Sequence, residues 1–66
     1  MTLKELREAK SLTQLEVAIK LGITPNTVGN WERGVQEPRF SQVPALAELY
    51  GVTIQEIYEA VKNSKA

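Results

Sequence analysis

Cysteine and histidine are both absent from this 66-residue sequence. Their absence excludes a disulfide framework and a zinc site built from Cys and His ligands. A glycine-rich phosphate loop is missing too, and no histidine is available as a base to activate Ser11, Ser41 or Ser64. We therefore expect no metal, no cofactor and no enzymatic activity.

Long apolar runs and an excess of charge of one sign are also absent. No stretch approaches the roughly 20 apolar residues of a membrane span. Lys4, Glu5 and Arg7 interrupt the region where a signal peptide would be apolar, so we expect a cytoplasmic protein. Eight Lys+Arg balance eight Asp+Glu. A nucleic-acid-binding function would therefore need an uneven distribution of these charges.

Capping signals divide the chain into short helices, and no alternating strand pattern is present. Three threonines precede a glutamate by three residues, the capping-box pattern of a helix start: Thr2–Glu5, Thr13–Glu16 and Thr53–Glu56. Thr24 caps a further helix that has Pro25 at its first position, and Ser41 is expected to cap another. The sequence predicts a single all-α domain over residues 1–66, with frayed ends at 63–66. Its predicted helices span residues 3–10, 14–21, 25–33, 42–50 and 54–62.

The predicted helix over residues 25–33 has one apolar face and one unusual polar face. Val28, Trp31 and the cap Thr24 fall on the face that we expect to meet the core. The opposite face carries two short amides and an arginine, with a glycine beside them. These residues are Asn26, Gly29, Asn30 and Arg33.

Two interpretations fit this polar face. It is either a merely polar surface with a tolerated glycine, which costs about 1 kcal/mol relative to Ala, or a face that reads DNA. Asparagine pairs with adenine N6 and N7, arginine binds guanine or phosphate, and a glycine lets the backbone approach a groove wall. The preceding residues favour DNA, because the helix over 14–21, the turn "LGIT" and the helix over 25–33 form a helix-turn-helix.

The motif "TQLEVAIKLGITPNTVGNWERG" resembles the Cro/CI-type (XRE-like) helix-turn-helix DNA-binding domain of phage and bacterial repressors. The matching positions are Gln14, Val17, Ala18, Leu21, Gly22, Ile23, Val28 and Trp31. The later "ERG…EPRF…LAELYGVTIQEI" is similar to the loop and last two helices of that family, so the resemblance covers about residues 3–57. It implies a compact five-helix, lambda-repressor-like domain of bacterial or phage origin.

The resemblance also implies which residues contact DNA. Asn26 and Asn30 would read base edges, while Thr27 and Arg33 would contact phosphates. Gln14 would touch DNA at the groove edge, where the start of its helix meets a phosphate. The full set of implied DNA-binding residues is Gln14, Thr24, Pro25, Asn26, Thr27, Gly29, Asn30, Arg33 and Arg39.

Other positions match structural or subunit-contact roles of the family. Arg7 and Glu32 match a partly buried salt bridge between the first and third helices. Trp31 is expected in the core, as are Ile54 and Ile57. Repressors of this type commonly dimerise on a two-fold operator, so we expect a homodimer on DNA. Tyr58 and Val61 are the candidate dimer contacts, with core packing as the alternative.

Two departures from the family leave a second function open. The loop residues Val35, Gln36 and Glu37 replace basic residues, which should lower affinity for DNA and flatten its salt dependence. Leu15 and Ile19 stand where charged residues are usual. We interpret them as an extension of the core, with a protein-contact surface as the alternative.

The main hypothesis is therefore a small transcription regulator, expected to be a repressor, that binds specific double-stranded DNA with the helix over residues 25–33 in the major groove. The alternative is a protein-interaction module on the same fold, such as an antitoxin or a regulator that binds a partner protein. The chain is expected to be either a very small regulator or the DNA-binding part of a longer protein.

Overall fold

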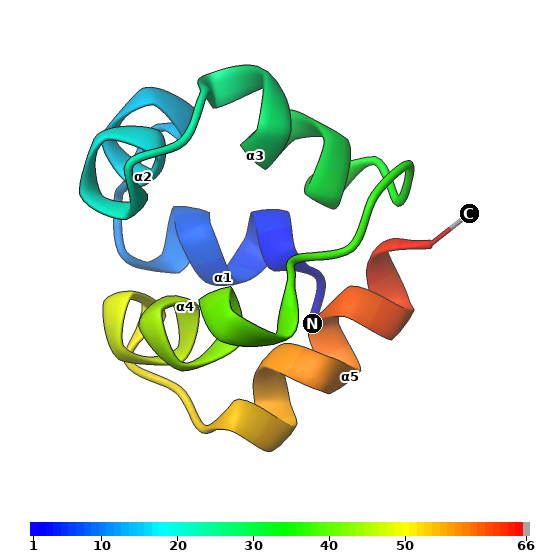
Figure 1. Ribbon diagram of the computed structural model, residues 1–66. Coiled ribbons are helices and arrows are strands. Elements are labelled where there is room, and N and C mark those ends of the chain that lie inside the picture. The colour runs from blue at the N-terminus through cyan, green and yellow to red at the C-terminus, as the bar shows by residue number, and fades with distance from the viewer. Residues whose placement is uncertain (66) are drawn as a thin grey trace.

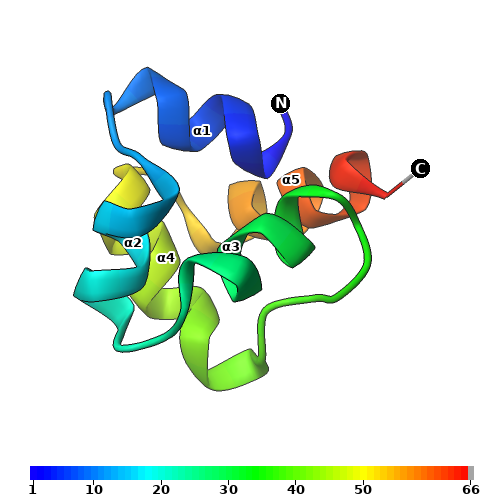
Figure 2. The same ribbon diagram turned by 90° about the horizontal axis from the view of Figure 1, so that it is seen from above.

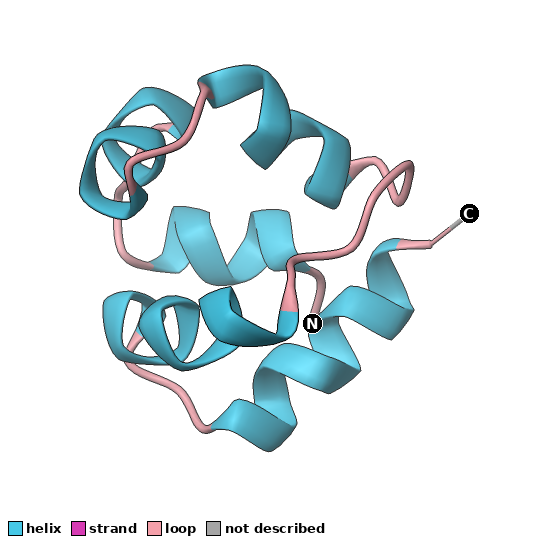
Figure 3. Ribbon diagram, viewed as in Figure 1, coloured by secondary structure: helices cyan, strands magenta, loops and turns pink. Residues whose placement is uncertain are grey.

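Five α-helices and one 3-10 turn form the regular structure of residues 1–65, the part of the chain that the computed structural model describes, and no strand occurs there (Figure 3). The elements are α1 (Leu3–Ala9), α2 (Gln14–Leu21), α3 (Pro25–Glu32), η1 (Phe40–Gln42), α4 (Val43–Tyr50) and α5 (Ile54–Ser64). The predicted all-α class is confirmed. None of these helices has the length and apolar character needed to cross a membrane.

The helix starts follow from local hydrogen bonds. At each of the three capping boxes, the threonine hydroxyl accepts a hydrogen bond from the glutamate N–H, at 3.1–3.2 Å, while the glutamate carboxylate accepts one from the threonine N–H, at 2.8–3.0 Å. At α3, the Thr24 hydroxyl accepts from the N–H of Thr27 at 3.2 Å. Two donors are satisfied at each box, so these helices begin where the sequence places their caps.

The start of α4 differs from the prediction. Ser41 does not cap this helix, because it lies inside the 3-10 turn that leads into it. The Gln42 side chain instead accepts a hydrogen bond from the N–H of Arg39 at 2.8 Å. Pro44 lies in the first turn of α4, where its missing N–H leaves no intrahelical bond unmade.

The helices enclose one apolar core. Figure 1 shows α2 and α3 above α1, with α4 and α5 below it. Figure 2, seen from above, shows α3 on the near side of the molecule, in front of part of α5. Trp31 and Ile57 are buried, as expected. The whole buried apolar set is Leu3, Leu6, Val17, Ala18, Val28, Trp31, Val43, Leu46, Ala47, Tyr50, Ile57 and Ala60.

Four other expectations about burial were wrong. Leu15 and Ile19 are 57% and 69% exposed, because α2 packs through Val17 and Ala18 and so turns its opposite face to solvent. Ile54 is exposed as well, since it begins α5 at the edge of the core. Thr24 is exposed because the residue that caps α3 precedes the helix and does not continue its apolar face.

The end of α5 is also more ordered than the predicted fraying at 63–66. The Ser64 hydroxyl accepts a hydrogen bond from the N–H of Leu3 at 3.0 Å and donates one to the carbonyl of Ala60 at 2.7 Å. The Asn63 amide donates to the carbonyl of Met1 at 3.0 Å. These bonds fasten the start of the chain to α5. The predicted fraying also included residue 66, which lies outside the described residues.

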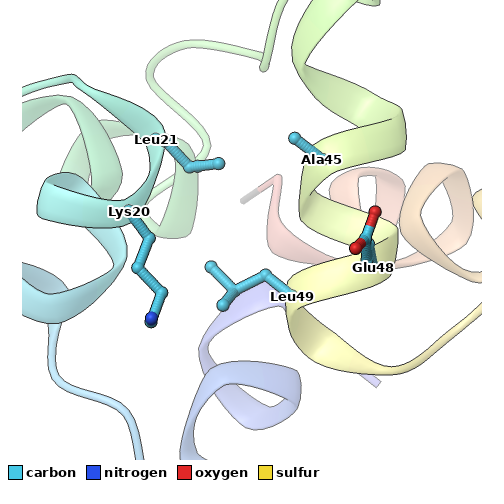
Figure 4. Close-up of a pocket in the computed structure, with 5 residues that line it drawn as sticks. All are labelled: Lys20, Leu21, Ala45, Glu48 and Leu49. Atoms are coloured by element: carbon cyan, nitrogen blue, oxygen red, sulfur yellow. The ribbon is translucent and has the colours of Figure 1, made fainter.

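An open hollow separates α2 from α4 (Figure 4). Its lining residues are Lys20, Leu21, Ala45, Glu48 and Leu49. The side chains of Leu21 and Leu49 point into the space between the two helices. Both leucines are partly buried and pack against the core, so the hollow is the edge of the core between these helices.

Acid should weaken this fold through the capping boxes. The threonine N–H groups that bond the carboxylates of Glu5, Glu16 and Glu56 lower the pKa of each below its usual 4.5. A lowered pKa in the folded state gives stability that is present above pH 4.5 and lost as the pH falls through the lowered value.

The measurement is urea unfolding between neutral pH and about pH 3. Replacement of all three glutamates by glutamine keeps an acceptor at each box but removes the titrating group. This variant should lose less stability on acidification than the parent. Equal losses in the two proteins would show that other groups cause the acid dependence.

Candidate nucleic-acid interface

A buried ion pair fixes α3 against α1. The Arg7 Nε and Nη2 atoms contact the two carboxylate oxygens of Glu32 at 2.6 and 3.1 Å, in a bidentate arrangement. The two side chains are 10% and 5% exposed, and Glu32 raises the pKa of Arg7. The structure therefore contains the salt bridge that the resemblance implies.

Two further hydrogen bonds extend this pair to the start of α2. Arg7 Nη1 donates to the carbonyl of Leu12 at 2.8 Å, and the Gln14 amide donates to Glu32 Oε1 at 3.0 Å. One carboxylate thus holds side chains from α1 and α2. This network sets how the two helices of the helix-turn-helix lie relative to each other.

Gln14 and Gly29 lie next to each other where α2 meets α3. Gln14 is half-buried and reaches across α3 to Glu32, so part of its hydrogen-bonding capacity is already used. Gly29 is buried, and a Cβ atom there would lie 3.6 Å from the Gln14 amide and 3.0 Å from Arg33 Nη1. The expectation that Gly29 lies open on the outer face was wrong, because these two side chains cover it.

The first turn of α3 presents a second group of predicted residues. Thr24, Pro25 and Asn26 are exposed there, and Thr27 is half-buried. The hydroxyls of Thr24 and Thr27 lie 2.9 Å apart and share a hydrogen bond. The cap and the first turn are therefore a polar surface held rigidly by the helix start.

The last turn of α3 carries a cluster that sequence reasoning found only in part. Asn30 accepts a hydrogen bond from Arg33 and donates one from Nδ2 to Gln36 Oε1 at 3.0 Å. The sequence marks Gln36 only as a non-basic loop residue. No local signal could have identified it, since this contact spans six residues across a turn.

Charge pairing changes the electrostatics around α3. Glu32 is neutralised by Arg7, and Glu37 pairs with Lys65. Arg33 and Arg39 are exposed, and Arg39 lines a hollow together with Thr27 and Trp31. The neighbourhood of α3 is thus more basic than the zero net charge of the chain suggests.

The two candidate dimer contacts differ in their surroundings. Tyr58 is exposed on α5, one turn after the exposed Ile54. Val61 is partly buried and packs against the core. The outer face of α5 therefore offers an apolar strip made by Ile54 and Tyr58, with Val61 at its inner margin.

Comparison with known proteins gives a consistent set of matches. Residues 3–57 match the family model described as helix-turn-helix. The chain is 40% identical over 55 residues to the cryptic phage CTXphi transcriptional repressor RstR of Vibrio cholerae. The matched residues make up 83% of this chain and 50% of that protein. It is 39% identical over 51 residues to the HTH-type transcriptional regulator ImmR of Bacillus subtilis, over 77% of this chain and 40% of that protein.

A third relative is close to this chain in length. The uncharacterized HTH-type transcriptional regulator MJ0272 of Methanocaldococcus jannaschii is 34% identical over 56 residues, which cover 85% of each protein. By contrast, the chain spans half or less of the length of RstR and ImmR. No solved structure gives a significant match.

Removal of one partner from the buried pair should cost more than removal of both. Glu32→Leu leaves the Arg7 charge buried without a carboxylate, and we expect a loss of about 3–5 kcal/mol in the free energy of unfolding. The double variant Arg7→Met/Glu32→Leu should be more stable than that single variant. Urea unfolding of the parent and the two variants measures this, and a double variant that is less stable than Glu32→Leu would contradict it.

Gly29→Ala should stabilise the fold by up to about 1 kcal/mol, because alanine is the better helix former. The nearest atom to the new methyl group is the mobile end of Arg33, which can shift aside. Gly22→Ala is the matched control, since Gly22 has a φ of +68° and alanine is strained there. In thermal unfolding, Gly29→Ala should have the highest melting temperature, the parent an intermediate one and Gly22→Ala the lowest. A Gly29→Ala variant that is less stable than the parent would contradict the expectation.

Proposed function

The chain belongs to the helix-turn-helix family of the Cro/CI (XRE-like) type, and from this membership we propose that it binds specific double-stranded DNA sequences with α3 in the major groove. Family membership and the regulators among its relatives support DNA-binding transcription regulation. We propose further that it acts as a repressor in the cytoplasm of a bacterial or phage-infected cell. The observation that carries this proposal is the outward polar face of α3.

That face supports base reading by its two asparagines. Asn26 is exposed at the start of α3, the end from which recognition helices reach base edges. Asn30, one turn later, is half-buried and held by its neighbours. Asparagine pairs in a bidentate manner with adenine in the major groove, so each residue is assigned an A·T pair.

The surrounding groups suit phosphate oxygens. Thr24 and Thr27 carry hydroxyls at the first turn of α3, and Arg33 and Arg39 are exposed cations. At the start of α2, the Thr13 hydroxyl takes the N–H of Glu16, which leaves the earlier N–H groups of the helix for a phosphate. Gln14 stands at the same helix start, and Pro25 contributes van der Waals contact.

A homodimer would place two copies of α3 in successive major grooves, about 34–36 Å apart, on a two-fold symmetric operator. The exposed Tyr58 supports a subunit contact on α5, with Val61 beside it in the same helix. Sedimentation of the protein with and without a two-fold site tests this part separately.

A protein partner is the second candidate function. The exposed Leu15 and Ile19 lie one turn apart on α2 and form an apolar patch that the fold leaves uncovered. This patch favours a contact with another protein, as in an antitoxin, and that role is compatible with DNA binding.

Selection of bound sequences from a random DNA pool, followed by a salt titration on the selected site, tests the proposed function. Enrichment of one motif, with affinity that falls as salt rises, is the expected result. No enrichment over random DNA would favour the protein-interaction role.

Asn30→Ala should weaken binding to the selected site by about 1–3 kcal/mol and relax the preference at one base pair. Arg39→Ala is the matched control, because loss of a phosphate contact should weaken all sequences alike and reduce the salt slope by about one. Binding titrations against the four base pairs at each operator position measure both effects. An unchanged ranking of sites in Asn30→Ala would remove the base-reading assignment.

A further inference from the structure

Gln36 lies in the loop after α3, and its side chain is joined to the proposed base-reading residue. Its Oε1 atom accepts a hydrogen bond from Asn30 Nδ2 at 3.0 Å. Gln36 is otherwise exposed, so this bond is not a consequence of core packing. The question is what the bond does for Asn30.

The loop backbone holds Gln36 at this place. Gly34 has a φ of +75°, which reverses the chain after α3, and its N–H donates to the carbonyl of Trp31 at 3.2 Å. The N–H groups of Val35 and Gln36 then both donate to the carbonyl of Asn30, at 3.0 and 3.3 Å. The main chain of Asn30 thus positions the residue whose side chain bonds its amide.

The end of α5 supports the same loop from outside. A Cβ atom on Gly34 would lie 2.7 Å from the Ser64 carbonyl oxygen and 2.7 Å from the Lys65 Cα, so the loop is in close contact with this helix end. Glu37, the residue after Gln36, pairs with Lys65. The loop that carries Gln36 therefore contacts both α3 and the end of α5.

The two ends of the Asn30 amide are distinguished by their partners. Arg33 can only donate, so it bonds the oxygen Oδ1, and the acceptor Oε1 of Gln36 takes the nitrogen Nδ2. A flipped Asn30 amide would lose the bond from Arg33, which has no acceptor, and would keep a bond to Gln36 only if the Gln36 amide flipped as well. In the observed orientation one N–H and one oxygen lone pair remain free, which is the pair that adenine N7 and N6 require.

We propose that Gln36 is a specificity-determining positioning residue, which holds the Asn30 amide in the orientation that reads adenine. The proposal rests on the proposed function, since it assigns Asn30 to a base edge. It gives the non-basic loop a role: the loop contributes selectivity in place of a phosphate contact.

The test compares Gln36→Met with Gln36→Glu, after selection of a preferred site with the parent protein. Methionine keeps the length of the side chain but has no strong acceptor, whereas glutamate keeps the acceptor. Gln36→Met should lower the preference at the base pair read by Asn30 by about two- to ten-fold, the effect of one net hydrogen bond. Gln36→Glu should bind all DNA more weakly, through charge repulsion, yet keep the parent ranking of base pairs.

A double variant separates positioning from direct reading. Asn30→Ala/Gln36→Met should have the same base preference as Asn30→Ala alone, because Gln36 acts through Asn30. Additive losses would show that Gln36 contacts DNA itself and would overturn the proposal. An unchanged ranking in Gln36→Met would overturn it as well, and circular dichroism should show equal folding in all variants.

Failure of the proposed function has a different signature. If the parent protein selects no motif, or if Asn30→Ala leaves the ranking unchanged, DNA reading by Asn30 fails before any Gln36 variant is examined, and the role of Gln36 falls with it. If Asn30→Ala relaxes one base pair and Gln36→Met does not, only the positioning role fails.

Discussion

The buried contact between Arg7 and Glu32 is the interaction on which the arrangement of the helices depends. It joins α1 to α3, and through Leu12 and Gln14 it reaches the start of α2. A buried ion pair adds little net stability, because desolvation offsets most of its Coulomb energy. Its contribution here is to geometry: the carboxylate accepts hydrogen bonds from two other helices, and only one orientation of α3 allows both.

This geometry explains why α3 tolerates residues that are poor helix formers. Asn26, Gly29 and Asn30 would destabilise an isolated helix of this length. Val28 and Trp31 anchor the opposite face in the core, and the cap and the ion pair hold the two ends. Tertiary contacts supply the helix stability, so the outward residues are free to serve recognition. Gly29 is covered by the side chains of Gln14 and Arg33, and of these only the mobile end of Arg33 comes as close as 3.0 Å to the place of a Cβ atom.

The charges follow the same logic. The chain is neutral overall, yet the two glutamates nearest the outer face of α3 are each matched by a cation. Salt-dependent affinity for DNA needs local positive charge, and net charge is a poor measure of it. Arg33 and Arg39 provide that local charge, although a loop without basic residues keeps the number of phosphate contacts small.

The sequence alone determined where α1, α2, α3 and α5 start, and it identified α2 and α3 as a helix-turn-helix. Each capping box lies within four residues, so the partners of its hydrogen bonds can be read from a local pattern. Which apolar residues are buried was decided by the tertiary structure. Leu15, Ile19 and Ile54 have the same hydrophobicity as core residues, but no neighbouring helix covers them. The bonds of Gln36 to Asn30 and of Ser64 to Leu3 likewise form only once distant segments meet, because they depend on how the chain turns and packs and not on any local pattern.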